Sequence, residues 1–241
     1  MHAAQATGIA TLTLDSPGNR NALSADLVAE LRSALAATAA DTAVRAVVLT
    51  HTGTTFCAGA DLKSPCDPAD FLALLRETAE LPKPVVARVT GHVRAGGLGL
   101  LGVCDIAAAG PQSSYAFTET HLGLAPAVIS MPLLPRLDPR AAARYFLTAE
   151  AFDAAEAARI GLLTLHGDDV DATLEPVLAG LRKASPQGLA ATKALTSAAV
   201  REALTRDGSR LTELSAGLFA SAEAREGITA RFERREPSWS L

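Results

Sequence analysis

Four short apolar segments, separated by stretches with helical periodicity, most constrain the fold of this chain. The segment Gly8–Asp15 alternates apolar and polar residues, which is typical of a strand with one buried face. The runs Val44–Thr50, Pro84–Val89 and Cys104–Ala109 are largely apolar and indicate buried strands. Helical segments between such strands favour right-handed crossovers. The sequence therefore predicts an α/β fold with a largely parallel sheet.

The second part of the chain has a different pattern. After about Pro139 no further strand is predicted, and alanine-rich amphipathic helices run almost to the end. The clearest helical segments are DPRAAARYFLT, FDAAEAARIGLL, PQGLAATKALTSAAV and LTELSAGLFASAEAREGITARFERR. We therefore divide the chain into a core region, residues 1–138, and a helical region, residues 139–241.

The segment RAGGLGLLGVCDI contains the spacing G-x-G-x-x-G at Gly97, Gly99 and Gly102, which is the spacing of a dinucleotide-binding turn. In such a turn the first glycine directly follows a strand, and a full crossover helix follows the glycines. Here the strand is expected to end near Val89, and the residues TGHVRA intervene. Only one or two helical turns fit before the next strand. The context therefore argues against a nucleotide site.

A helix that begins at a glycine run offers another chemistry. The N–H groups of its first turn have no partners within the helix, and the helix dipole adds partial positive charge there. Glycine also allows a ligand atom to approach the backbone closely. A second glycine-containing loop, TFCAGADLK at Thr55–Lys63, follows an earlier predicted strand. One N–H from each loop can converge on a carbonyl oxygen, so the two loops predict an oxyanion hole.

Charge and cysteine usage exclude several other classes of function. The formal net charge is -4, which argues against a nucleic-acid partner because phosphate binding relies on clustered Lys and Arg. Cys57, Cys66 and Cys104 lack metal-ligand spacing, and two of them lie in apolar runs typical of buried thiols. No apolar run reaches membrane-spanning length, and the start lacks the pattern of a signal peptide. We expect a cytoplasmic protein without a membrane partner.

Five segments together resemble the crotonase superfamily, which includes the enoyl-CoA hydratases and isomerases. In chain order they are NRNALS, FCAGADLK, PVVARVTGHVRAGGLGLLGVCDI, YAFTETHLGLAP and ASPQGLAATKAL. The similarity covers nearly the whole chain in the right order, so the motifs are specific as a set. The resemblance implies a crotonase-like spiral of ββα turns followed by a helical trimerisation region, with acyl-CoA thioesters as substrates.

The resemblance also implies roles for individual residues. The thioester oxygen is expected to accept hydrogen bonds from the N–H groups of Ala60 and Gly96, which is worth about 3–4 kcal/mol per donor. Glu119, in FTETHLG, matches a family glutamate and is expected to transfer the proton. The residues expected to contact the substrate are Ala58, Gly59, Asp61, Leu62, Lys63, Gly97, Gly99 and His121. Coenzyme A is then part of the substrate, and neither a separate cofactor nor a metal is expected.

Gly99 stands where two-glutamate hydratases of the superfamily carry their first glutamate, and three interpretations remain open. In the first, the protein resembles the isomerases, in which one glutamate moves a proton between C2 and C4. In the second, it resembles bacterial methylglutaconyl-CoA hydratases, which the run HLGLAPAVIS favours. In the third, it binds acyl-CoA with little hydratase activity. Overall similarity favours a hydratase that adds water across the 2,3 double bond of an enoyl-CoA.

Other polar residues in the motifs have both a functional and a structural interpretation. Asp61 fits hydrogen bonding within its turn, and Asp105 fits bonding to donors near a strand start. Arg94 is expected either to reach a substrate carboxylate or to lie at the surface. Arg20 and Lys63 are expected to meet the phosphates of CoA or solvent.

Assembly is the last expectation. The alanine-rich helices after Ala151 carry more apolar surface than a small appendage can bury, which predicts a homotrimer or a dimer of trimers. Relatives place the last helix near a CoA site, so Phe232 and Arg235 are candidate contacts to the adenine or a phosphate. Outside the enzyme class the alternatives are an acyl-CoA-binding scaffold and an RNA-binding protein, and the acidic charge balance argues against RNA.

Overall fold

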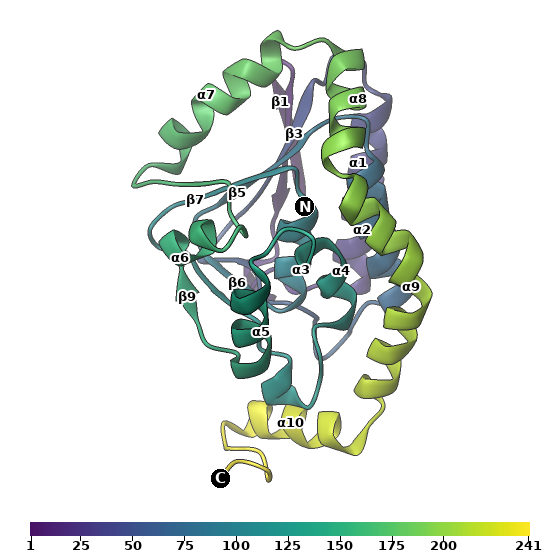
Figure 1. The fold of residues 1–241 in the computed structure, drawn as a ribbon, viewed down its shortest axis with the longest axis vertical. Helices are drawn as coiled ribbons and strands as arrows, with labels where there is room; N and C mark the ends of the chain where they lie inside the picture. The colour runs from purple at the N-terminus through teal and green to yellow at the C-terminus, as the bar shows by residue number, and fades with distance from the viewer.

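The computed structural model describes residues 1–241 and contains two sheets, between which the strands from β3 to β8 alternate (Figure 1). The larger sheet has the order β1-β2-β3-β5-β7-β10, with strands His2–Ala6, Ile9–Leu14, Ala46–His51, Val85–Val89, Ile106–Ala109 and Leu165–His166. The smaller sheet has the order β4-β6-β8-β9, with strands Thr55–Cys57, His92–Arg94, Ser114–Ala116 and Phe152–Asp153.

Each turn of the chain adds one strand to each sheet and then a helix. The three full turns are β3-β4-α2, β5-β6-α3 and β7-β8-η2-α4, and the helices are α2 Pro68–Glu80, α3 Gly96–Val103, η2 Thr120–Leu122 and α4 Ala127–Leu133. The strands β3, β5 and β7 pair in parallel, as do β4, β6 and β8. The ββα spiral expected from the resemblance is therefore confirmed.

The four strands predicted from the apolar segments are present as β2, β3, β5 and β7. The expectation that strands stop after about Pro139 is wrong, because β9 and β10 follow it. Each of these two strands has only two residues, too few for an alternating pattern to show. The sequence patterns also do not predict β1 or the short strands β4, β6 and β8.

Seven of the ten α-helices begin after a residue whose side chain caps them, and α3, α4 and α9 (Ala198–Phe219) have no such cap. The first helix, α1 (Ala25–Ala40), starts after Ser24, whose hydroxyl accepts a hydrogen bond from Leu27 N–H. The later helices are α5 Pro139–Thr148, α6 Ala154–Arg159, α7 Val170–Lys183, α8 Pro186–Thr196, α9 Ala198–Phe219 and α10 Ala222–Glu233. The last predicted helical segment is divided, because Ser221 caps α10 by accepting from Ala224 N–H. None of the helices is both long enough and apolar enough to cross a bilayer.

The hydrophobic core continues across the boundary drawn at residue 138. One cluster of 49 buried residues extends along the chain from Leu12 to Leu211. Helices α8 and α9 run along the side formed by α1 and α2, with α9 against α2 and α4, and α10 crosses one end of the molecule (Figure 1). A smaller cluster joins Val170 and Leu174 of α7 to the larger sheet.

A buried ion pair attaches α8 to the spiral. The Lys193 ammonium lies 2.8 Å from Asp105 Oδ2 and donates to the carbonyl oxygens of Thr78 and Lys83 at 2.9 and 3.1 Å. Asp105 also accepts from Val85 N–H at 2.7 Å, which confirms its expected role at a strand start. All donors of the ammonium therefore have acceptors inside the protein.

We predict that Lys193→Ala lowers the free energy of unfolding by about 3–5 kcal/mol, because it leaves the buried Asp105 carboxylate without its counter-ion. Urea denaturation measures the change. Lys183→Ala, at an exposed position on α7, is the control and is expected to change stability by less than about 0.5 kcal/mol. A loss below 1 kcal/mol in Lys193→Ala would contradict this account.

Candidate active site

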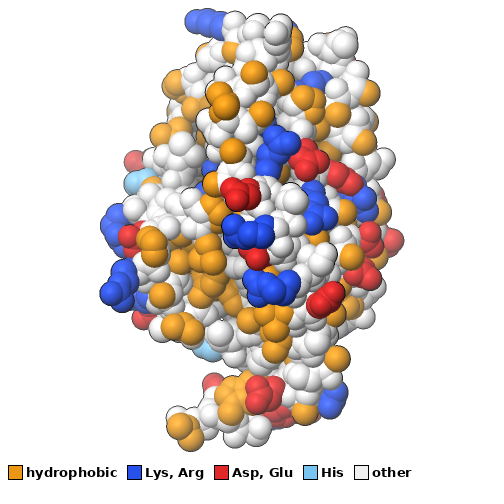
Figure 2. Space-filling model, turned by 45° about the vertical axis from the view of Figure 1, so that its right-hand side comes forward, with side chains coloured by type: hydrophobic (Ala, Val, Ile, Leu, Met, Phe, Trp, Pro, Cys, Tyr) orange, Lys and Arg blue, Asp and Glu red, His pale blue; other side chains and the backbone are white.

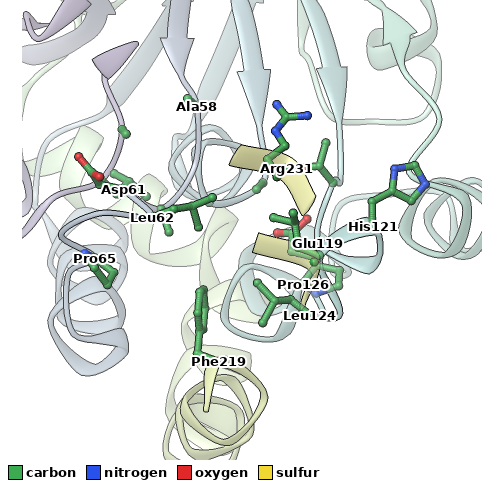
Figure 3. Close-up of a pocket in the computed structure, with 18 of the residues that line it drawn as sticks. Ala58, Asp61, Leu62, Pro65, Glu119, His121, Leu124, Pro126, Phe219 and Arg231 are labelled. Carbon is green, nitrogen blue, oxygen red and sulfur yellow. The ribbon is translucent and has the colours of Figure 1, made fainter. Parts of the chain in front are cut away.

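A cavity of about 880 Å³ lies between the loop after β4, the start of α3, the η2–α4 segment, α9 and α10. Figure 3 shows Leu62 and Pro65 on one side of it and Glu119 on the other, with Phe219 of α9 pointing in between them. Eight residues expected from the sequence line it, namely Ala58, Ala60, Asp61, Leu62, Lys63, Gly96, Glu119 and His121. The structure does not place Gly59, Gly97 or Gly99 on its wall.

Two free backbone N–H groups lie next to each other on the cavity wall. Leu23 N–H donates to Gly59 O, and Asp61 N–H donates to Leu23 O. The N–H of Ala60 thus takes no part in this pairing, and Gly96, the first residue of α3, has no acceptor within its helix. A Cβ atom on Gly96 would lie 3.7 Å from Ala60 N. The two amides therefore lie close together on the cavity wall, and such proximity is one requirement of an oxyanion hole.

The backbone around these amides is held in unusual conformations. Ala95, just before α3, has φ 46° and ψ −121°, a conformation that costs a non-glycine residue about 1–3 kcal/mol. Its N–H donates to Ala116 O at 3.1 Å, and its carbonyl accepts from Leu98 N–H at 2.8 Å. Gly59 has φ 89°, and a Cβ atom there would lie 2.8 Å from Ala95 Cβ. Glycine is therefore required at position 59 to let the two loops meet.

Glu119 is the buried acid of the cavity. Only 8% of its surface is exposed, and its Oε2 atom is buried without a hydrogen-bond partner. Burial raises the pKa of the Glu119 carboxyl to about 7, while a hydrogen bond with its own backbone opposes the rise. A carboxyl group that titrates near neutral pH can both accept and donate a proton. Its position and chemistry suit a general acid/base.

The place beside Gly99 is filled by apolar side chains. A Cβ atom on Gly99 would lie 2.6 Å from Ile129 Cγ2 and 3.3 Å from Phe71 Cζ. Ile129 and Phe71 both line the cavity, whereas Gly99 lies behind them. The expectation that Gly99 contacts substrate is therefore corrected, since this glycine allows α3 and α4 to pack closely.

The other two glycines expected to bind substrate also have packing roles. A Cβ atom on Gly97 would lie 2.8 Å from both Cβ and the carbonyl oxygen of Cys57, so Gly97 brings α3 against β4. Gly59 brings its loop against Ala95, as described above. These glycines shape the site from outside the cavity.

Charged and polar residues lie mainly around the margin of the site. Asp61 accepts from the N–H groups of Lys63 and Ser64, which confirms its predicted role within the turn. His121 is exposed, and its ring points away from Glu119 (Figure 3). No cluster of three or more His, Cys, Asp and Glu side chains is arranged to hold a metal ion.

Arg94 does not reach the cavity. Its guanidinium donates to the carbonyl oxygens of Val93 and Ser114 at 2.9 and 2.6 Å and to the Ser114 hydroxyl at 2.8 Å. Of the two alternatives for Arg94, contact with a substrate carboxylate does not fit the structure, because the side chain is bound to β6 and β8.

The C-terminal part of the chain supplies cavity residues that the motifs did not indicate. Phe219 and Ala216 come from α9, Arg231 comes from α10, and Trp239 follows α10. Phe232 and Arg235, named as candidates from the resemblance, also line the cavity. Helical periodicity indicates which residues share a face, but it does not indicate which distant loop that face will meet.

Comparison with known proteins agrees with this arrangement. A family model described as "Enoyl-CoA hydratase/isomerase" matches residues 4–241. The chain belongs to this family. It is an enzyme of the crotonase superfamily.

Similar proteins come from several organisms. A crystal structure of an enoyl-CoA hydratase from Mycobacterium avium is 52% identical, with a TM-score of 0.90, covering 97% of this chain and 94% of that one. An enoyl-CoA hydratase/isomerase from Pseudoalteromonas atlantica is 29% identical, with a TM-score of 0.89 and 99% coverage of both chains. The mevalonyl-coenzyme A hydratase of Aspergillus fumigatus is 30% identical over 96% of this chain and 91% of its own length.

We predict that Gly59→Ala reduces kcat/KM on an enoyl-CoA substrate by at least about a hundredfold, because the new Cβ pushes the Ala60 and Gly96 amides apart. Steady-state kinetics measures the loss, and circular dichroism checks the fold. The control is Gly110→Ala, where a Cβ atom meets nothing within 4 Å and normal activity is expected. A folded Gly59→Ala enzyme with full activity would show that these amides do not bind the substrate.

Proposed function

We propose that the protein interconverts 3-enoyl-CoA and 2-enoyl-CoA thioesters, with Glu119 as the acid/base and the Ala60 and Gly96 amides binding the thioester oxygen. The observation that supports this most strongly is that Glu119 lines the cavity beside apolar side chains. A single buried carboxyl, whose Oε2 atom has no hydrogen-bond partner, lines a cavity together with the apolar side chains of Ile129 and Phe71. One such group is sufficient for isomerisation, because the same carboxyl can take and return the proton.

The proton moves between two carbon atoms of the substrate. Glu119 as carboxylate removes a proton from C2 of the 3-enoyl thioester, and the electron pair delocalises onto the thioester oxygen. The amides of Ala60 and Gly96 stabilise this negative charge. Glu119, now protonated, delivers the proton to C4 as the double bond moves from C3–C4 to C2–C3. No atom is gained or lost.

Hydration of 2-enoyl-CoA is the second candidate activity. The names of the Mycobacterium avium and Aspergillus fumigatus proteins favour it, and it was the activity that overall sequence similarity favoured. Water must then be held near C3 and deprotonated. Glu119 is the only buried carboxyl among the three that line the cavity, and the filled space beside Gly99 leaves no room for another one. The geometry thus supports proton transfer between carbons better than activation of water.

Binding of the CoA moiety is expected at the charged margin of the cavity. Arg20, Lys63, Arg231 and Arg235 line it and offer positive charge to phosphate groups. CoA is part of the substrate in this proposal, so the reaction needs no separate cofactor. A protein that binds acyl-CoA without turnover would have the same charged residues at the margin of its cavity. Activity measurements distinguish such a protein from an enzyme.

The expected homotrimer, or dimer of trimers, remains a prediction, as does the cytoplasmic location. Leu134, Leu147 and Leu195 each expose more than half of their surface, at 52%, 74% and 79%. Apolar side chains on the outside of helices are suited to burial between copies of one chain. Sedimentation equilibrium measures the assembly state.

We predict that Glu119→Gln lowers kcat for 3-enoyl-CoA isomerisation by at least about a thousandfold, because the amide cannot accept the proton, while the Kd of a saturated acyl-CoA stays within about twofold. Rates are followed by absorbance of the conjugated product, and binding by calorimetry. The control is Glu236→Gln, at an exposed carboxylate on the cavity margin. Equal activity of Glu119→Gln and wild type would remove Glu119 from the reaction.

We also predict that Ile129→Ala raises the ratio of hydration to isomerisation by about tenfold or more, because it opens space for water beside Gly99. The ratio is measured by chromatographic separation of 2-enoyl-CoA and 3-hydroxyacyl-CoA products. Val128→Ala, on the same cavity but not against Gly99, is the control. An unchanged ratio in Ile129→Ala would show that Ile129 does not exclude water from the reaction.

A further inference from the structure

The last helix makes backbone-to-backbone contact with the turn that follows Glu119. A Cβ atom on Gly227 of α10 would lie 2.6 Å from the carbonyl carbon of Leu122 and 2.7 Å from its Cα atom. On the other side of the contact, a Cβ atom on Gly123 would lie 2.7 Å from the carbonyl carbon of Glu223. Neither glycine can be replaced unless α10 or η2 moves.

Glu119 and this turn form one hydrogen-bonded unit. The carbonyl oxygen of Glu119 accepts from the N–H groups of both Leu122 and Leu124, at 2.9 and 3.0 Å. Gly123 closes the turn with φ 67°, which favours glycine. A displacement of Leu122 is therefore transmitted to the backbone of Glu119.

Helix α10 also closes the cavity around Glu119. Ala224 and Ala230 are 0% and 1% exposed, and Gly227, Ala230 and Arg231 line the same cavity as the carboxyl. The C-terminal segment nevertheless projects from the body of the protein, at the bottom of the view in Figure 2. Its packing partners are chiefly η2 and, to a smaller extent, α9. The contact with η2 is therefore the main attachment of a projecting helix.

We propose that α10 positions the catalytic carboxyl: the contact of Gly227 with Leu122 holds the Glu119 turn in place and keeps water away from its side chain. This inference rests on the proposed role of Glu119 in proton transfer. Gly227 and Gly123 are positioning residues, since in this proposal neither of them touches the reacting atoms. The helix is thereby part of the active site, although it carries no acid or base in the reaction.

The charges around Glu119 are consistent with this role. Of the elements packed against η2, α10 brings Arg231 into the cavity, and α5 carries Arg144 and Tyr145, which bond to Glu150 and Glu156. Within η2 itself, His121 is exposed. None of these groups contributes to the raised pKa of Glu119, which comes from burial. Exclusion of water, rather than a neighbouring charge, is therefore what α10 contributes.

Titration of the Glu119 carboxyl tests the proposal without depending on turnover. The absorbance of the Glu119 carboxyl is obtained as the infrared difference spectrum between each protein and the same protein carrying Glu119→Gln. Gly227→Ala must displace α10 from Leu122, so the pKa of Glu119 is expected to fall from about 7 toward its ordinary value of 4.5. Its kcat is expected to fall by about tenfold to a hundredfold, since small displacements of a catalytic group have effects of this size. Gly217→Ala on α9, where a Cβ atom meets nothing within 4 Å, is the matched control and is expected to match wild type.

A folded Gly227→Ala protein with the wild-type carboxyl titration and wild-type kcat would overturn the proposal. If the titration shifts but Glu119→Gln is as active as wild type, the positioning role stands and the proposed function fails.

A milder variant covers the case in which Gly227→Ala does not fold. Ser221→Ala removes only the cap of α10, whose loss is expected to speed amide exchange of α10 by about fivefold. The proposal predicts that amide exchange at Leu122 and Leu124 becomes faster by the same factor. Ser185→Ala, which removes the equivalent cap of α8, is the control and leaves these amides unchanged. Faster exchange in α10 without faster exchange at Leu122 and Leu124 would overturn the proposal.

Discussion

The removal of one carboxyl group from water is the constraint on which the rest of the site depends. Burial of Glu119 disfavours its charged form and brings its pKa to about 7. Because the folded pKa lies above the ordinary value of 4.5, this group's contribution to stability falls as the pH rises from about 4.5 to 7, and the cost is fully present above that range. A structure that keeps such a group needs compensating interactions, which the large apolar core provides.

The spiral explains how three distant parts of the sequence meet at this carboxyl. Parallel pairing of β4, β6 and β8 places the segments that follow these strands at one edge of the smaller sheet. Those segments carry the Ala60 amide, the Gly96 amide and Glu119 in turn. Helices α9 and α10 also line this cavity, so residues from the spiral and from the C-terminal helices surround the Glu119 carboxyl. Each functional group is thus supplied by one turn of a repeated unit.

The sequence predicts the parts of this arrangement that depend on local pattern. The strands β2, β3, β5 and β7 have alternating or apolar runs. The two-residue strands β9 and β10 have no such pattern, because tertiary pairing alone defines them. The motifs also indicate Ala60, Gly96 and Glu119 as cavity residues. They do not show that Ile129, thirty positions after Gly99, occupies the space beside it, since contacts between helices depend on the packed fold.

The central claim is that one buried carboxyl carries a proton between two carbon atoms, and isotope transfer tests it most directly. The substrate is a 3-enoyl-CoA with deuterium at C2, and the product is analysed by NMR after a single turnover in ordinary water. The account predicts 2-enoyl-CoA in which part of the deuterium removed from C2 is found at C4, because the buried Glu119 carboxyl exchanges slowly with solvent. Complete loss of that deuterium to water, together with 3-hydroxyacyl-CoA as the main product, would contradict it.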